Sequence, residues 1–417
     1  MKKRFWTGFL SGLIGAIVLV VVAGATYLML NDDRKNSVIP YEDVAAAEKD
    51  NEEDDYSYDK IVEKLSLLKM LIDTYYLDEV DPENFATGIY RGFIASLNDP
   101  YSTYYTKEEY SNLLESSSGV YYGIGAVVSQ DVKTGIITVV KPYEGTPAYN
   151  AGLLPNDIIY KVNGEEVTGK DLTEVVSKIK GKEGTEVVIT IYRDGVDEPM
   201  DFTIVRQKIN TPTIEFEMLD SRNKIGYIQI TEFDEITVSQ FSDAVSRLER
   251  KGMKGLIIDV RDNPGGLLNS VVKILDRLIY KGLLVYTEDK NGQREEKYAD
   301  DSKQFNKPIV VLINENSASA SEIFAGALQD YEKATIVGTT SFGKGIVQSV
   351  IPLTDGTAVK LTISKYYTPK GRNIHGTGIT PDVEIELDEE LKKMVTIPHD
   401  QDNQLQKAIE IIKDKIK

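Results

Sequence analysis

The chain has 417 residues, of which 41% are apolar, and this is long enough for two or three domains with packed cores. It contains no cysteine, which excludes disulfides, thiolate nucleophiles and thiolate metal sites. A formal net charge of −18 argues against nucleic acid as a partner, because phosphate binding requires clustered Lys and Arg.

The N-terminus begins with Met1-Lys2-Lys3-Arg4 and continues with 26 uncharged, mostly apolar residues, 5–30. A helix needs roughly 20 such residues to cross a bilayer. Residues 1–30 therefore predict a cytoplasmic start and a single transmembrane anchor in the cell membrane, and the positive-inside rule places the remaining chain outside the cytoplasm. The segment 23–25, Ala-Gly-Ala, leaves a cleaved signal peptide and a secreted form as an alternative, although the apolar region is about twice the usual 7–15 residues.

Residues 31–57 are acidic and lack apolar periodicity, which is typical of a solvated linker. Residues 58–117 carry apolar residues at spacings of three or four, and this pattern predicts a helical segment of two or three helices.

The period changes in residues 118–206, where short β-branched runs bounded by Gly, Pro, Asn and Asp surround one helical stretch. We expect a small, mostly β domain there. In residues 207–417 strand and helix patterns alternate, as in a largely parallel sheet covered by helices. The fold class is multidomain α/β. Active sites of such sheets lie at the carboxyl ends of the strands, which directs attention to the strand-to-helix junctions 259–266 and 314–322.

One motif imitates a phosphate-binding loop: Gly338, four residues, then Gly343 and Lys344. Such a loop requires Ser or Thr after the lysine and a helix behind it. Here Gly345 follows, and the next residues, "GIVQSVIPL", are β-branched and end in Pro352. The sequence thus disfavours a nucleotide site.

Lys344 is alternatively a general base. It would need its pKa lowered by about 3 units, or roughly 4 kcal/mol, and burial among apolar strands could supply this. On a strand Lys344 and Gln348 share a face, so the amide oxygen of Gln348 could orient the amine. An exposed strand lysine with a polar neighbour is the plain alternative.

Three serines, Ser317, Ser319 and Ser321, precede an amphipathic helical run. At least one is expected to be an N-cap, and Ser321, followed by Glu322, is the best candidate. A serine at such a junction also lies beside unpaired amides and the positive end of the helix dipole, which favour a developing oxyanion. Spacing alone does not decide whether Ser319 caps the helix or acts as a nucleophile.

The sequence has two histidines, His375 and His399, and both lie in loop-like stretches. A Ser-His-Asp triad therefore lacks a candidate base.

At this point the chain resembles the C-terminal processing, or tail-specific, peptidases, which are serine proteases with a Ser-Lys pair and a PDZ domain. The resemblance implies that 118–206 is the PDZ domain and that 207–417 is a crotonase/Clp-like protease domain ending in a C-terminal helix. The motifs that carry it are "GFIASLNDPYSTYY", "YYGIGA", "GTPAYNAGLLPNDIIYKVNG", "DVRDNPGG", "NENSASASEIFAGAL", "GTTSFGKGIVQ" and "GTGITPDVEI".

The resemblance also assigns roles. Ser319, the middle serine of the S-A-S-A-S-E run, matches the nucleophile, Lys344 matches the base, and Gln348 matches the residue that assists the base. No cofactor and no metal is implied.

The resemblance implies an oxyanion hole formed by the amide of Ala320 together with that of Gly265 or Gly266. In PDZ domains a short Gly-containing loop binds a peptide carboxylate while the peptide adds to a sheet edge. The residues that match this loop are Tyr121, Tyr122, Gly123, Ile124, Gly125 and Ala126.

The partners expected from the resemblance are proteins or peptides with free, apolar C-termini. The segments 58–115 and "QLQKAIEIIKDKI" resemble parts that relatives use for dimerisation, although an apolar helical stripe is also common inside a core. A catalytically silent PDZ scaffold is the alternative function, and the joint presence of Ser319, Lys344 and Gln348 argues against it.

Overall fold

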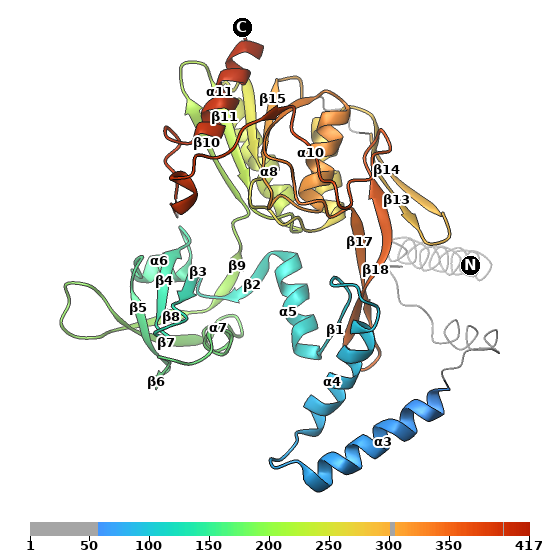
Figure 1. Cartoon of the computed structure of the whole chain (residues 1–417). Helices are drawn as coiled ribbons and strands as arrows, with labels where there is room; N and C mark the ends of the chain where they lie inside the picture. The colour runs from blue at the N-terminus through green and yellow to red at the C-terminus, as the bar shows by residue number, and fades with distance from the viewer. Residues whose placement is uncertain (1–56, 301–304, 395) are drawn as a thin grey trace, which may run out of the picture. The chain divides into compact units, whose positions relative to one another are not determined.

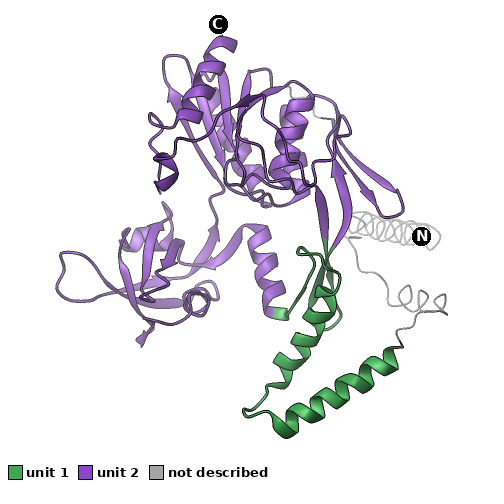
Figure 2. Cartoon of the chain, viewed as in Figure 1, with its two compact units in different colours: residues 1–107, 349–361 green, residues 108–348, 362–417 purple. Residues whose placement is uncertain are grey.

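The computed structural model describes residues 57–300, 305–394 and 396–417 (Figure 1). The predicted anchor at 5–30 and nearly all of the linker at 31–57 lie outside these residues. Within the part described, no helix is long and apolar enough to cross a membrane. The chain divides into two compact units, residues 1–107 with 349–361 and residues 108–348 with 362–417 (Figure 2).

The described N-terminal residues of the first unit, 57–107, are mostly helical, as the periodicity predicts. They contain α3 (Tyr58–Tyr75), α4 (Pro82–Ala95) and β1 (Thr103–Tyr105), which pairs antiparallel with β18 (Ala358–Tyr367). Asp81 caps α4 by accepting a hydrogen bond from the Glu83 N–H. Neither α3 nor α4 has a buried side chain. A third helix, α5 (Lys107–Ser118), belongs to the second unit from Glu108 onward.

Residues 118–206 fold as an antiparallel β domain with its own core. The sheet order is β3 (Ala126–Gln130), β4 (Ile137–Pro142), β5 (Ile158–Val162), β7 (Glu186–Tyr192) and β8 (Met200–Val205), with β6 (Glu165–Glu166) on β5. Two helices, α6 (Pro147–Ala151) and α7 (Leu172–Ile179), accompany it. Alternate strand residues such as Val187, Ile189 and Ile191 are fully buried, which is the period expected of a sheet with one covered face. Where the chain enters and leaves, β2 (Val120–Gly123) pairs with β9 (Gln207–Asn210).

The C-terminal part is built on a six-stranded sheet. Its order is β10 (Ile214–Asp220), β11 (Ile225–Ile230), β12 (Gly255–Asp259), β15 (Ile309–Ile313), β16 (Ala334–Gly338) and β19 (Val383–Glu384), and every pair except β10·β11 is parallel.

Helices cover both faces of this sheet. Apolar residues of α8 (Thr237–Arg250), α9 (Leu268–Leu278) and α10 (Ala320–Asp330) share a core with Leu256 and Ile258 of β12. On the other face α11 (Asn403–Lys415) packs on Ile257. Alternate residues of β12 thus face opposite cores. The strand-helix alternation predicted for residues 207–417 is present from β11 to β16, interrupted by residues 282–299.

Two hairpins that the alternation does not predict form a second sheet. They are β13 (Gly282–Asp289) with β14 (Arg294–Ala299), and β17 (Ile346–Pro352) with β18. The turns that follow β12 and β15 lie side by side at the carboxyl ends of the strands, because β12 and β15 are parallel neighbours.

Candidate active site

The turns after β12 and β15 are bound to each other by reciprocal hydrogen bonds. The Asp262 N–H donates to Asn314 Oδ1 at 2.9 Å, and Asn314 Nδ2 donates back to Asp262 Oδ1 at 2.9 Å. Asn316 Nδ2 adds a further bond to the same carboxylate oxygen at 2.8 Å. The two strand-to-helix junctions singled out in the sequence therefore form one rigid unit.

Two of the three clustered serines hold this unit together. The Ser317 hydroxyl donates to the Val260 carbonyl at 2.7 Å, and the Ser321 hydroxyl donates to the Asn263 carbonyl at 2.9 Å. Both serines are fully buried. The expectation that Ser321 is the N-cap is wrong: it lies inside α10, and its hydroxyl is used across the junction instead of on the helix end.

Ser319 is the N-cap of α10 and is half-buried. Its backbone has φ 53° and ψ −111°, a region that non-glycine residues rarely adopt and that costs of order 1–3 kcal/mol. Its N–H donates to Glu322 Oε2 at 2.8 Å. The surrounding bonds thus hold Ser319 in a sharp turn between strand and helix, which is a common setting for a functional side chain.

Gly265 lies directly against Ser319. A Cβ at Gly265 would stand 2.9 Å from Ser319 Cβ, 2.8 Å from the Ala318 oxygen and 3.0 Å from the Ala320 nitrogen, and its φ is 112°. Only glycine fits there without displacing backbone. The structure therefore brings the candidate nucleophile, Ser319, together with two candidate oxyanion-hole residues, Gly265 and Ala320.

The N–H groups near Ser319 are not equivalent. The Gly265 N–H already donates to Asn263 Oδ1 at 2.8 Å. The Phe233 N–H donates to the Gly265 carbonyl, and the Phe233 carbonyl accepts from the Leu267 N–H. These two bonds flank Gly266 in a parallel bridge, so the Gly266 N–H points away from Phe233. Among the described residues neither the Gly266 N–H nor the Ala320 N–H meets a protein acceptor. Of the two glycines considered from the sequence, Gly266 has the available donor.

The glycine-rich segment with Lys344 folds as a loop between β16 and β17. The Lys344 N–H donates to Glu322 Oε2 at 2.8 Å, and the Gly343 N–H and the Ser341 hydroxyl donate to Oε1 at 2.7 and 2.6 Å. Glu322 is fully buried. The amides that would hold a phosphate in a nucleotide-binding loop hold a carboxylate of the chain itself, and a strand follows, which agrees with rejecting the nucleotide site.

Tyr366 on β18 joins the same two segments from another side. Its hydroxyl contacts the Ser319 carbonyl at 3.0 Å and also donates to the Lys344 carbonyl. Burial, with a further contribution from the Glu322 charge, raises the pKa of Tyr366 well above its ordinary value, so the hydroxyl remains a neutral donor.

Lys344 and Gln348 do not share one strand face. Strand β17 begins at Ile346, so Lys344 precedes it in the loop, and the alternation predicted for a strand does not apply. Both side chains are half-buried. Gln348 Nε2 lies 3.5 Å from Thr362 Oγ1 on the neighbouring β18.

The segment predicted to bind peptide, 121–126, is divided between two sheets. Tyr121, Tyr122 and Gly123 pair with β9, whereas Ala126 begins β3. The carbonyls of Ile124 and Gly125 accept bonds from residues 143–148. Strand β3 is the edge strand of its sheet and pairs with β4 on one side, and an open edge of this kind can accept an added strand.

Sequence reasoning missed two residues that organise the site, Glu322 and Tyr366. The spacing S-x-x-E from Ser319 to Glu322 is that of a capping box, and it could have identified the glutamate. No local signal identifies Tyr366, which is distant in sequence. The histidines lie in exposed turns, and His399 Nδ1 lies 2.9 Å from Glu217 Oε1.

Family models match three parts of the chain. "Peptidase family S41" matches residues 224–385, "PDZ domain" matches 138–193, and "Activating protease CtpB N-terminal domain" matches 19–109. The β domain at 118–206 therefore contains a PDZ domain, and the main sheet with its two junctions belongs to the peptidase part.

Curated relatives cover most of the chain. Carboxy-terminal processing protease CtpA of Bacillus subtilis (strain 168) is 42% identical over 79% of this chain and 70% of its own length. The CtpB protease of the same organism is 38% identical over 88% of this chain and 74% of its own length. A solved structure from Bacteroides fragilis assigned to the S41 proteases covers 82% of this chain and 93% of its own, with a TM-score of 0.51 and 18% identity, and supports the fold alone. The chain belongs to peptidase family S41 and is a serine-type C-terminal processing protease with a PDZ domain.

Proposed function

We propose that the protein is a membrane-anchored, extracytoplasmic endopeptidase that cleaves proteins with Ser319 as nucleophile and Lys344 as general base. One observation carries this proposal. The N–H groups of Ser319 and Lys344 donate to the same oxygen, Glu322 Oε2, each at 2.8 Å. Their nitrogens are therefore at most 5.6 Å apart, although 25 positions separate them in sequence. Tyr366 adds a second connection through the two carbonyls.

In the proposed reaction the Ser319 oxygen attacks the scissile carbonyl while the neutral amine of Lys344 takes the hydroxyl proton. The carbonyl oxygen becomes an oxyanion that accepts hydrogen bonds from the Ala320 and Gly266 amides, at the positive end of α10. Lys344 then returns the proton to the leaving amine. A water attacks the acyl carbon and passes a proton to Lys344, the ester bond to Ser319 breaks, and Lys344 returns the proton to the Ser319 oxygen. Gln348 is proposed to orient the amine of Lys344 through its amide oxygen.

The substrate is proposed to bind through its C-terminus. An extended peptide would add to the open edge of β3, and its apolar end and carboxylate would lie against residues 121–126. Residues 5–30 would anchor the chain in the membrane, with the peptidase outside the cytoplasm. We also propose a homodimer that uses the helical segment at 58–115 and the C-terminal stretch.

The test uses the full chain in detergent beside its Ser319→Ala and Lys344→Ala variants. Each is incubated with an unfolded protein that ends in apolar residues, and fragments are followed by mass spectrometry. Cleavage by the parent alone is the expected result. Equal peptide binding by all three proteins without cleavage by any would favour the silent scaffold, and cleavage by Ser319→Ala would refute the assigned nucleophile.

A further inference from the structure

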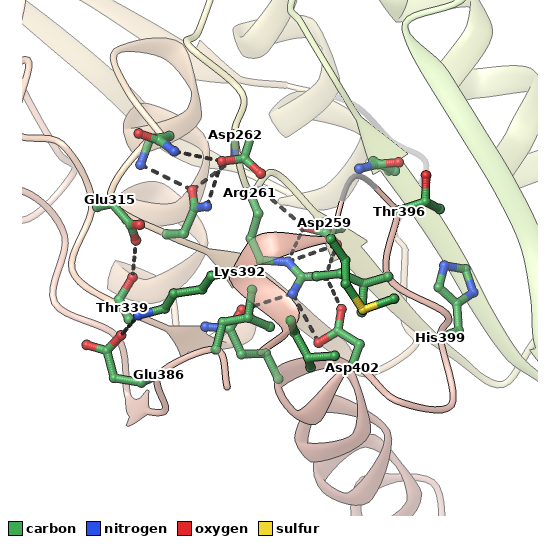
Figure 3. A pocket seen from close by; sticks show the side chains of 18 of the residues that line it. Asp259, Arg261, Asp262, Glu315, Thr339, Glu386, Lys392, Thr396, His399 and Asp402 are labelled. Atoms are coloured by element: carbon green, nitrogen blue, oxygen red, sulfur yellow. Dashed lines mark hydrogen bonds and ion pairs between the residues drawn. The ribbon is translucent and has the colours of Figure 1, made fainter. Parts of the chain in front are cut away.

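The N-terminus of the last helix, α11, carries a buried ion cluster that the reaction scheme does not use (Figure 3). Asp402 is the N-cap of α11 and accepts the Leu405 N–H at 2.9 Å. The same carboxylate accepts two bonds from Arg261, at 2.8 Å from Nη2 and 3.2 Å from Nη1. Asp402 is 4% exposed, so this contact is shielded from water.

Arg261 uses its whole guanidinium in this cluster. Nε lies 3.0 Å from Asp259 Oδ1, Nη2 lies 2.6 Å from Asp259 Oδ2, and Nη1 lies 2.9 Å from Gln404 Oε1. Asp259 is two residues away at the end of β12, whereas Asp402 and Gln404 are more than 140 positions away. The contacts with Asp402 and Gln404 are therefore the ones that connect the turn to the C-terminal helix.

Arg261 begins the turn that contains Gly266, one of the two proposed oxyanion donors. Asp262 and Asn263 follow it and bond to the serine segment, Gly265 lies against Ser319, and Gly266 comes next against Phe233. The Arg261 N–H donates to Asp259 Oδ1 at 3.0 Å, the same oxygen that accepts from Nε, so one carboxylate connects the guanidinium to the main chain at the start of the turn. A donor that is displaced from the developing oxyanion loses most of its effect.

We propose that Asp402 is a positioning residue for the oxyanion turn, and that the C-terminal helix thereby contributes to catalysis through Arg261. This inference rests on the proposed function, since it assumes that the turn stabilises an oxyanion next to Ser319. Breaking the Asp402–Arg261 pair relaxes the turn and weakens transition-state binding, while the binding of ground-state peptide is unaffected.

The test is Asp402→Asn in the full chain in detergent. Asparagine caps helices as well as aspartate does, so α11 keeps its N-terminal bond, whereas the charge is lost and the oxygen that accepts from Arg261 Nη2 becomes an NH₂ group. Removing an oxyanion donor outright costs 10²–10³ in kcat, so an indirect displacement is expected to lower kcat by about 10-fold with KM changed less than about twofold. Asp402→Glu, which keeps a carboxylate near the guanidinium, should recover most of kcat.

The matched control is Lys413→Gln. Lys413 pairs with Asp220 at 3.2 Å and ties the other end of α11 to the domain, at a more exposed position. It should leave kcat unchanged. If Asp402→Asn retains full kcat, or if both variants lose kcat equally, the proposal is wrong, because α11 would then act only by general docking.

A second readout isolates the oxyanion. A peptide boronic acid forms a tetrahedral adduct with the nucleophile, whereas a plain peptide binds as ground state. Asp402→Asn should weaken boronate binding about as much as it lowers kcat and leave peptide binding unchanged; equal weakening of both would overturn the proposal.

Should this variant fail to fold, Gln404→Met, which removes another acceptor of the same guanidinium, is measured with the same expected split. Failure of the proposed function itself is recognised separately, by cleavage that survives Ser319→Ala.

Discussion

Replacing Glu322 by glutamine tests whether one buried carboxylate holds the two catalytic segments in place. Each carboxylate oxygen accepts two donors: Oε1 from Ser341 and Gly343, and Oε2 from Ser319 and Lys344. Glutamine offers one oxygen and one NH₂ group, so one pair of donors loses its acceptor. The favoured orientation places the NH₂ toward Ser341, because its hydroxyl can rotate to accept a bond, whereas the N–H groups at Oε2 cannot.

In that orientation the Gly343 N–H is left unpaired, which costs about 1–3 kcal/mol in a fully buried site. The Ser319 and Lys344 N–H groups keep an acceptor that is no longer charged, and neutral bonds are roughly half as strong. Halving two charge-assisted bonds of about 1.5–3 kcal/mol each loses about 1.5–3 kcal/mol, so the sum is about 2.5–6 kcal/mol. The bonds to Glu322 hold the strained backbone of Ser319, so weakening them lets Ser319 relax out of its catalytic position. We therefore expect kcat to fall along with the free energy of unfolding.

The assay pairs denaturant unfolding with peptide cleavage measured far below the unfolding midpoint. Glu315→Gln is the matched control, since Glu315 is exposed, lies in the turn before Ser319 and bonds only to the Thr339 hydroxyl among the described residues. It should change stability by less than about 0.5 kcal/mol. A Glu322→Gln protein with wild-type stability and wild-type kcat would refute the reasoning.

Three further results are expected. Gly265→Ala should abolish cleavage while peptide binding persists, because the added Cβ would meet Ser319 Cβ at 2.9 Å and the Ala320 nitrogen at 3.0 Å; retention of more than about a tenth of kcat would contradict this placement of the turn. Tyr366→Phe should cost about 1–3 kcal/mol in urea unfolding and lower kcat, since it leaves the Ser319 and Lys344 carbonyls without their shared donor; an unchanged unfolding midpoint would argue against the contact. Burial, reinforced by the Glu232 charge, raises the pKa of Asp234 to about 7 from 3.8, so its contribution to stability is complete below pH 4 and is lost as pH rises through 7, by up to about 4 kcal/mol. Asp234→Asn should therefore be more stable than the parent at pH 8 and equal to it at pH 4, and parallel pH profiles of the two proteins would rule this out.

The fold was predictable where local pattern determines structure. The strands at 225–230, 255–259, 309–313 and 334–338 are apolar runs bounded by turn residues, and α8 and α9 each show one buried stripe, whereas α10 is buried along nearly its whole surface. The second sheet was not predicted, because its hairpins pair β13 with β18 across about 80 residues and no local period reports such pairing.

In the candidate site, too, local pattern predicted some features, whereas features that depend on long-range contacts were not predicted. The pattern of three serines located the junction, but the choice among them depends on which hydroxyls bond to Val260 and Asn263, and those partners lie more than 50 positions away. Similarly, the strand alternation that joined Lys344 to Gln348 assumed a strand that begins two residues later in the structure. Long-range hydrogen bonds decide both points, and a single sequence does not contain them.

The most direct test of the central claim is to trap the acyl-enzyme. The full chain in detergent is mixed with an activated acetyl ester, quenched in acid and mapped by mass spectrometry. We predict one acetyl group, on the peptide that contains Ser319, that is absent in Ser319→Ala and forms far more slowly in Lys344→Ala. An acetyl ester that forms rapidly at a residue other than Ser319, or an undiminished rate in Lys344→Ala, would contradict the Ser-Lys assignment.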